Sequence, residues 1–122
     1  MAYVLAAVGG ALGALARSGV ATALPPSPGG WPWATLLVNL TGCLLIGVLL
    51  AVLHSRFPAS TWWRPFLAVG VLGGYTTFST LMYETMRLVE DGDLLRAGAN
   101  SLGSIVAGLM AVYLGIVLGR LV

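Results

Sequence analysis

The stretch GGYTTFSTL, residues 73–81, interrupts a long apolar segment and decides how that segment crosses a membrane. Glycine costs about 1 kcal/mol relative to alanine inside a helix, and serine and threonine side chains compete for backbone hydrogen bonds. Non-helical backbone at membrane depth is tolerated only where it is buried in protein or lines a cavity. We therefore expect the helix to break near Gly73–Thr77, and the carbonyl groups released there to form a cation site.

The composition indicates an integral membrane protein. The chain has 122 residues, of which 58% are hydrophobic and only 8% are charged. A soluble domain has about 25% charged residues, so there are too few charges here to cover a surface that faces water. All six basic residues are scattered arginines, and the net charge of +2 therefore does not predict nucleic-acid binding. The one cysteine, Cys43, lies in an apolar run and is interpreted as a small buried residue.

Four segments have the length and composition of membrane-spanning helices. A span needs about 20 apolar residues. The sequence offers such segments at about 2–23, 33–53, 64–87 and 98–119. We expect residues 1–122 to form a single all-α domain with four transmembrane helices. Small residues repeat at four-residue spacing in these segments, which indicates that the helices pack closely.

The arginines are divided evenly between the two sides of the membrane. Four spans place both termini and the 54–65 connection on one side. Each side then carries three arginines: Arg56, Arg64 and Arg120 on the first, and Arg17, Arg87 and Arg96 on the second. The positive-inside rule gives no preferred orientation for a balanced count. We therefore expect copies inserted in both orientations to pair as an antiparallel, dual-topology dimer. Four spans are also too few to enclose a pore alone.

Several polar or aromatic residues inside the spans have two interpretations. Asn39 either makes a helix–helix hydrogen bond or donates to an ion in a pore. Arg17 either extends to the membrane surface or attracts anions at a vestibule. Phe78 either packs in the interior or presents its positive ring edge to an anion. Glu84 is the only carboxylate within the third span, and the other spans have none, which disfavours a proton antiporter.

The fourth span carries a polar face of its own. Asn100, Ser104 and Gly108 lie at i, i+4 and i+8, so they share one side of the helix. Asn100 and Ser104 are therefore candidates for a polar track along an ion pathway.

The whole chain resembles the CrcB/Fluc family of fluoride channels. The matching stretches are GGALGALAR (9–17), TLLVNLTGCLLIG (35–47) and GGYTTFST (73–80). The resemblance implies an antiparallel dimer with two fluoride pores and a central sodium ion. It implies a passive channel in the cell membrane that exports cytoplasmic fluoride and confers fluoride resistance. Such a channel is not an enzyme. Its expected partners are fluoride, membrane lipid and a second subunit, and it is not expected to bind nucleic acid.

The resemblance also implies roles for individual residues. Asn39 would donate to fluoride, and Phe78 would be the first of two phenylalanines whose ring edges line the pore. The carbonyls of Gly73 and Thr76 would hold the sodium ion. The remaining positions implied by the resemblance are Arg17 at the vestibule and four polar residues of the pathway: Thr35, Thr80, Asn100 and Ser104.

Two positions depart from the family pattern. Leu81 stands where the second phenylalanine is expected, and Gly108 replaces a residue that is often serine. A homodimer would conduct with half of each aromatic pair, whereas a heterodimer would take the missing ring from a paralogous subunit. The balanced arginines favour the homodimer.

Two other functions compete with a fluoride channel. A small multidrug-type, proton-coupled exporter also has four spans and dual topology, but it needs a carboxylate in its first helix, which this chain lacks. A non-conducting membrane assembly subunit is the third interpretation.

Overall fold

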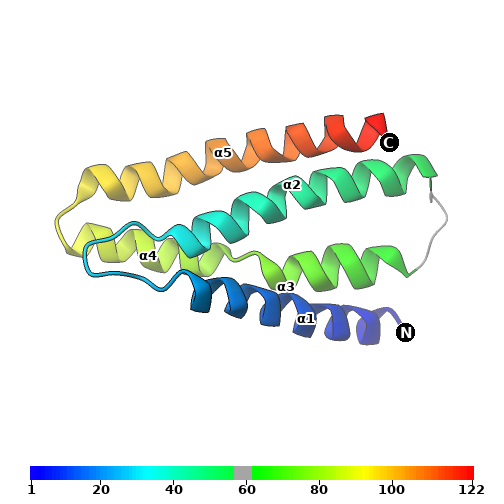
Figure 1. Cartoon of the computed structure of the whole chain (residues 1–122), viewed down its shortest axis with the longest axis horizontal. Coiled ribbons are helices and arrows are strands. Elements are labelled where there is room, and N and C mark those ends of the chain that lie inside the picture. Colours follow the sequence, from blue (N-terminus) through cyan, green and yellow to red (C-terminus); the bar gives the residue numbers. More distant parts are fainter. Residues whose placement is uncertain (57–61) are drawn as a thin grey trace.

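A computed structural model describes residues 1–56 and 62–122, and these residues are almost entirely helical. The elements are α1 (Ala2–Ala23), α2 (Trp33–Arg56), η1 (Arg64–Leu72), α3 (Gly73–Tyr75), α4 (Phe78–Glu90) and α5 (Leu94–Leu121). The described residues contain no strand (Figure 1). Four helical segments are long and apolar enough to cross a membrane, with η1, α3 and α4 together making the third. The predicted all-α membrane protein with four spans is confirmed.

The four spans run alternately up and down. Both chain termini lie at one end of the bundle, and the 24–32 loop and the turn before α5 lie at the other (Figure 1). Residues 57–61 of the 54–65 connection lie outside the described part of the chain. The second span continues to Arg56 and the fourth begins at Leu94, so both are longer than the sequence indicated.

The third span breaks at Thr76 and Thr77. Thr76 has an extended ψ of 158°, and Thr77 has φ −150° and ψ 113°. The expected break is present but shorter than predicted, because Gly73–Tyr75 remain helical and the Thr76 N–H still donates to the Leu72 carbonyl at 3.0 Å. The segment before Gly73, η1, is a π-helix, a form that is often found at functional sites.

The break allows the third span to change its packing partner. Its first half, η1 and α3, packs on α1, whereas its second half, α4, packs on α5. The helix α5 also packs along α2. The cartoon shows this change, with the chain crossing from beside α1 to beside α5 (Figure 1). The halves therefore belong to different helix pairs, and the break lies where the two pairs meet.

Glycines bring the backbones of each pair into contact. A Cβ on Gly13 of α1 would overlap the Val71 carbonyl and lie 2.8 Å from the Tyr75 nitrogen. In the other pair, a Cβ on Gly47 would lie 3.1 Å from Gly115 Cα. These contacts are with backbone atoms, which cannot rotate away. The small-residue spacing in the sequence thus corresponds to two close helix packings.

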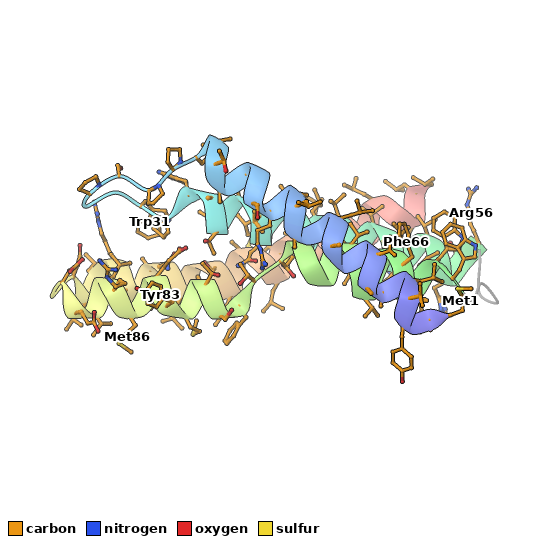
Figure 2. The ribbon with its side chains drawn as sticks, turned by 90° about the horizontal axis from the view of Figure 1, so that it is seen from below. Met1, Trp31, Arg56, Phe66, Tyr83 and Met86 are labelled. Carbon is orange, nitrogen blue, oxygen red and sulfur yellow. The ribbon has the colours of Figure 1, made fainter. Side chains whose placement is uncertain are left out.

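Most large apolar side chains point outward. The fully buried apolar residues among those described are few: Val38, Leu53, Leu72, Leu81 and Ala97. Side chains project from the outer faces of all the helices, including Tyr83 and Met86 of α4 (Figure 2). A soluble protein would bury far more of this surface. The outward face is suited to lipid or to another protein chain.

Candidate ion pathway at the helix break

Asn39 of α2 holds the break by two hydrogen bonds to the backbone of one residue. Its Nδ2 donates to the Thr77 carbonyl at 3.0 Å, and the Thr77 N–H donates to its Oδ1 at 2.8 Å. In a continuous α-helix the Thr77 N–H would donate to the Gly73 carbonyl instead. Asn39 therefore replaces a helical bond and releases that carbonyl. The helix–helix hydrogen bond considered from the sequence is present, and one amide hydrogen remains for another acceptor.

Arg17 of α1 points toward the same break. Its Nη1 lies 3.4 Å from the Thr76 carbonyl oxygen, and its side chain is half-buried. The guanidinium group therefore contacts the break instead of extending away from it. This arrangement places a permanent positive charge beside non-helical backbone, where it can attract an anion.

The carbonyls of Gly73 and Thr76 are the predicted ligands of a monovalent cation. The Gly73 carbonyl has lost its helical donor to Asn39, and the Thr76 carbonyl leaves the helix at an extended residue. Unwound carbonyls of this kind coordinate sodium in other membrane proteins. The described residues contain no cluster of acidic, histidine or cysteine side chains that could hold a metal, so carbonyls are the relevant ligands. The residues present fit a sodium ion.

Thr77 also starts the helix that follows the break. Its Oγ1 accepts from the Thr80 N–H at 3.2 Å and donates to Thr80 Oγ1 at 3.0 Å, which caps the N-terminus of α4. Phe78 is the first residue of α4, and its side chain is 70% exposed. Thr80 is exposed too, and its own hydroxyl hydrogen is not used in the cap. The start of α4 thus exposes both an aromatic ring and a hydroxyl donor, and of the two only Thr80 lines the cavity described below.

Leu81 does not join this exposed group. Its side chain is only 6% exposed and lies in the interior of the chain. The position where the family has its second phenylalanine is therefore buried here, whereas Phe78 is open. A single chain does not form an aromatic pair at the break.

A cavity of about 700 Å³ leads from the loop end of the bundle to the break. It is enclosed by the 24–32 loop, the end of α1, the start of α2 and one side of α4. Its lining includes Arg17, Thr35, Thr77, Thr80 and Glu84. Three of the predicted site residues, Arg17, Thr35 and Thr80, thus face one space. Hydroxyl groups, a guanidinium and a carboxylate add polar atoms to a lining that is otherwise mostly apolar.

Thr35 and Glu84 interact inside this cavity. The Thr35 hydroxyl donates to Glu84 Oε1 at 2.5 Å. The second carboxylate oxygen, Oε2, is buried with no hydrogen-bond partner in the described structure, and so is Nε1 of Trp31 on the opposite wall. Trp31 lies on the side of the loop that faces α4 (Figure 2). Glu84 and Trp31, which line the cavity, therefore each have one buried polar atom without a hydrogen-bond partner in the described structure.

The predicted polar residues of α5 do not face this cavity. Asn100 is 1% exposed and donates to Thr85 Oγ1 at 3.0 Å, which links α5 to α4. Ser104 is half-buried, and its Oγ has no hydrogen-bond partner among the described residues. Gly108 is buried and lies close to Cys43, which is itself only half-buried. Within one chain, these α5 residues are therefore separate from the residues at the break.

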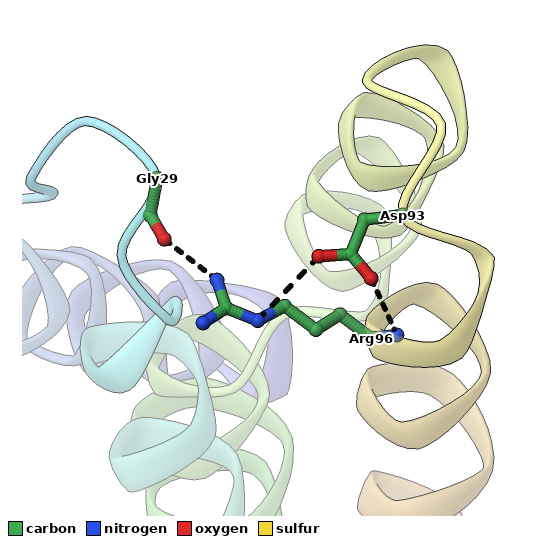
Figure 3. Close-up of polar contacts among 3 residues, drawn as sticks. All are labelled: Gly29, Asp93 and Arg96. Carbon is green, nitrogen blue, oxygen red and sulfur yellow. Dashed lines mark hydrogen bonds and ion pairs between the residues drawn. The ribbon is translucent and has the colours of Figure 1, made fainter.

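The 24–32 loop is fastened over the cavity by Arg96. Its Nη1 donates to the Gly29 carbonyl at 2.6 Å, and its Nε lies 3.5 Å from Asp93 Oδ2 (Figure 3). Asp93 also caps α5 by accepting from the Arg96 N–H at 3.1 Å. The acid thus orients the arginine that holds the loop. No local sequence pattern predicts this contact, because Arg96 and Gly29 are 67 residues apart in the chain.

Comparison with known proteins identifies the family. The pattern of the CrcB-like proteins, described as camphor resistance (CrcB), matches residues 4–116. The chain belongs to the CrcB-like family. The resemblance that the three motifs indicated is therefore confirmed.

Named relatives in the CrcB-like family cover nearly the whole chain. The fluoride-specific ion channel FluC of Thermus thermophilus is 48% identical over 118 residues, which cover 96% of this chain and 94% of that protein. FluC 1 of Mycobacterium tuberculosis is also 48% identical, over 95% of this chain and 89% of its own length. FluC of Solibacter usitatus is 42% identical over 98% of this chain and 99% of its own length.

Proposed function

We propose that this chain forms a passive, fluoride-selective channel that exports cytoplasmic fluoride through the cell membrane and confers resistance to it. The observation that carries the proposal is the break in the third span, where Asn39 makes two hydrogen bonds to the backbone of Thr77, a residue that lines the cavity. The relatives named as fluoride-specific channels, similar along nearly their whole length, support the choice of ion. The chain is a channel rather than an enzyme.

A passive channel is sufficient for export. In acid surroundings, hydrogen fluoride crosses the membrane uncharged and dissociates in the neutral cytoplasm, where the fluoride charge traps it. A negative interior drives an anion outward with about 2.3 kcal/mol per charge per 100 mV. A selective leak for fluoride therefore lowers the internal concentration without a pump or a coupled proton.

Selectivity would come from uncharged donors close to the break. Asn39 retains one amide hydrogen, Thr80 retains its hydroxyl hydrogen, and Phe78 can present a positive ring edge. Uncharged groups can replace the water around a small anion without binding it permanently. Chloride is larger and would make these contacts less closely. Thr35 belongs to the same polar route through the cavity.

The conducting unit that we propose is an antiparallel homodimer. In one chain Phe78 is 70% exposed and Gly73 is exposed, so the groups at the break lie on the surface of the molecule. A second copy would cover them and enclose the pathway, and its α5 would supply Asn100 and Ser104. The balanced arginines favour copies in opposite orientations. A heterodimer with a paralogous subunit is the alternative, which would supply a phenylalanine opposite the buried Leu81.

We also propose a structural sodium ion at the centre of this dimer. The carbonyls of Gly73 and Thr76 would hold it, since neither is engaged in a regular helical bond across the break. Two carbonyls from one chain are too few to surround a cation, and an antiparallel partner would supply two more. The ion would join the two copies rather than move with the anion.

One observation favours a second candidate function, a proton-coupled exporter. Glu84 is embedded in the third span and faces the cavity with one free carboxylate oxygen. A titratable group in such a place is typical of proton relays. This function predicts that transport depends on a pH gradient, which a passive channel does not require.

The proposed function is tested by fluoride efflux from liposomes that contain the purified protein. We expect rapid fluoride efflux with a potassium ionophore present, far slower chloride efflux, and no dependence on an imposed pH gradient. Equal fluoride and chloride efflux would reject the selectivity, and no efflux would favour a non-conducting assembly subunit.

A variant and a matched control locate the pathway. We expect Asn39→Asp to abolish fluoride efflux, because a fixed negative charge would repel the ion and would face the Thr77 carbonyl. Ser55→Ala, near the opposite end of α2, should leave efflux unchanged, since its hydroxyl donates to the Val52 carbonyl of its own helix, far from the break. Near-normal efflux through Asn39→Asp would remove Asn39 from the pathway.

A further inference from the structure

The last helical residue before the break, Tyr75, is anchored to α2 by its hydroxyl group. The hydroxyl groups of Tyr75, at the end of α3, and Thr41, in α2, lie 2.9 Å apart. Thr41 Oγ1 also lies 2.7 Å from the Leu37 carbonyl oxygen, to which it donates its hydrogen. A threonine hydroxyl has a single hydrogen, so the Tyr75 phenol must be the donor between the two side chains.

Together with Asn39, this pair defines a short surface on α2, residues 39–42, that contacts residues 75–77 of the third span. Asn39 holds the backbone of Thr77 on one side, and Thr41 holds the side chain of Tyr75 on the other. Thr76 lies between these two anchors. Its methyl group fits against Gly42, where a Cβ would overlap it.

The two anchors together fix the direction of the Thr76 peptide. The backbone at Thr76 and Thr77 lacks regular helical hydrogen bonds on its C-terminal side, so side chains from α1 and α2 define its position. The contact from Arg17 to the Thr76 carbonyl is long, at 3.4 Å, and constrains it weakly. Asn39 restrains the C-terminal side of Thr76, because the Thr77 N–H that it accepts belongs to the same planar peptide as the Thr76 carbonyl. The Thr76 N–H donates to the Leu72 carbonyl on the other side, and the Tyr75 anchor ties this end of α3 to the helix that carries Asn39.

We propose that Thr41 and Tyr75 are positioning residues for the ion pathway. By fixing Tyr75 on α2, their hydroxyl pair acts together with Asn39 to set the orientation of the Thr76 carbonyl and the place where α4 and Phe78 begin. Neither residue needs to touch the ion. The inference rests on the proposed channel function and adds residues that control its selectivity from outside the pathway.

A purely structural role would have a different consequence. A hydroxyl pair that only satisfied two polar groups in an apolar interior would affect stability, and its removal from both sides would be almost neutral. A positioning role predicts instead that loss of the pair changes selectivity while the protein remains folded.

The test compares Thr41→Val, which keeps the shape of the side chain but removes the hydroxyl, with Thr41→Ser, which keeps the hydroxyl. Tyr75→Phe removes the other partner. Two quantities are measured on the full chain: the ratio of fluoride to chloride efflux from liposomes, and the hydrogen-exchange rate of the Thr76 and Thr77 amides. Hydrogen bonds between membrane helices average about 0.6 kcal/mol, which corresponds to about a threefold effect.

We expect Thr41→Val and Tyr75→Phe each to lower the efflux ratio about threefold and to speed exchange at Thr77, with Thr41→Ser close to the unchanged protein. The double variant Thr41→Val with Tyr75→Phe should be no worse than either single variant, because both remove one interaction. Equal behaviour of Thr41→Val and Thr41→Ser, or additive effects in the double variant, would overturn the proposal. If the unchanged protein conducts no fluoride, the channel function fails, and hydrogen exchange alone still decides whether the pair positions the break.

Discussion

Replacing Gly42 with alanine should disturb the break without touching any group that could contact the ion. The added Cβ would overlap Cγ2 of Thr76, while its next neighbours, Tyr75 Cδ1 at 3.5 Å and Thr76 Cβ at 3.7 Å, are at ordinary contact distances. The conflict is therefore with one methyl group. Thr76 is β-branched, and its Oγ1 donates to the Leu72 carbonyl at 3.0 Å, so its side chain cannot turn freely.

The magnitude follows from these contacts. An extra methyl group in a packed site costs about 1–3 kcal/mol, and breaking the Thr76 hydroxyl bond costs about 0.5–1.5 kcal/mol. Alanine gains about 1 kcal/mol over glycine in the interior of α2. The net loss in the free energy of unfolding is then about 0.5–3.5 kcal/mol. The steric strain, however, is located at the break. If it raises the free-energy barrier to ion passage by about 1 kcal/mol or more, conduction falls roughly fivefold or further.

Fluoride efflux and thermal unfolding in detergent, measured on the same protein samples, separate the two effects. Gly42→Ala should lose most of its efflux while it still folds and unfolds in a thermal transition, at a moderately lower temperature. Adding Thr76→Ser, which removes Cγ2 but keeps the hydroxyl and the carbonyl, should restore efflux. Gly103→Ala is the control, because nothing lies within 4 Å of a Cβ at that position.

Two results would refute this reasoning. Unchanged efflux through Gly42→Ala would show that the position of Thr76 does not matter for conduction. Failure of Thr76→Ser to restore efflux would show that the overlap with its methyl group is not the cause.

Further predictions concern the packing and the loop. Gly13→Ala should lower the thermal unfolding temperature in detergent, because its Cβ would overlap backbone atoms that cannot rotate away. Gly19→Ala should leave the unfolding temperature unchanged, because a Cβ there would meet none of the described atoms within 4 Å. Equal unfolding temperatures for the two variants would argue against the close packing of α1. Arg96→Gln should speed amide exchange in the 24–32 loop, because the bond to the Gly29 carbonyl is lost, and Arg120→Gln should leave it unchanged. Slow exchange in both variants would mean that Arg96 does not fasten the loop.

The sequence was sufficient to predict the spans and the existence of the break. About 20 apolar residues make a span whatever their neighbours are, so length and composition identify the four segments. The break was predictable because glycine and hydroxyl residues are unfavourable inside a helix. The exact position of the break, at Thr76 and Thr77, was not predictable from the sequence. Asn39, which lies on another helix, determines that position by accepting a hydrogen bond from the Thr77 N–H. A local pattern cannot contain that information.

The site was predicted less completely than the fold. Arg17, Thr35 and Thr80 line one cavity, whereas Asn39 and Phe78 are not among the residues that line it. The burial of Leu81 and the link from Asn100 to Thr85 depend on how α4 packs against α5, which no motif encodes. The Thr41–Tyr75 pair was missed because each residue has an unremarkable environment in the sequence and only the fold joins them.

The most direct test of a passive fluoride channel is the reversal potential of the current through purified protein in a planar bilayer. With a tenfold fluoride gradient, equal chloride and equal pH on both sides, the reversal potential should be displaced by about 59 mV in the direction set by fluoride. Adding a pH gradient should not move it. A reversal potential that follows the proton or chloride gradient, or the absence of any fluoride current, would contradict the proposed function.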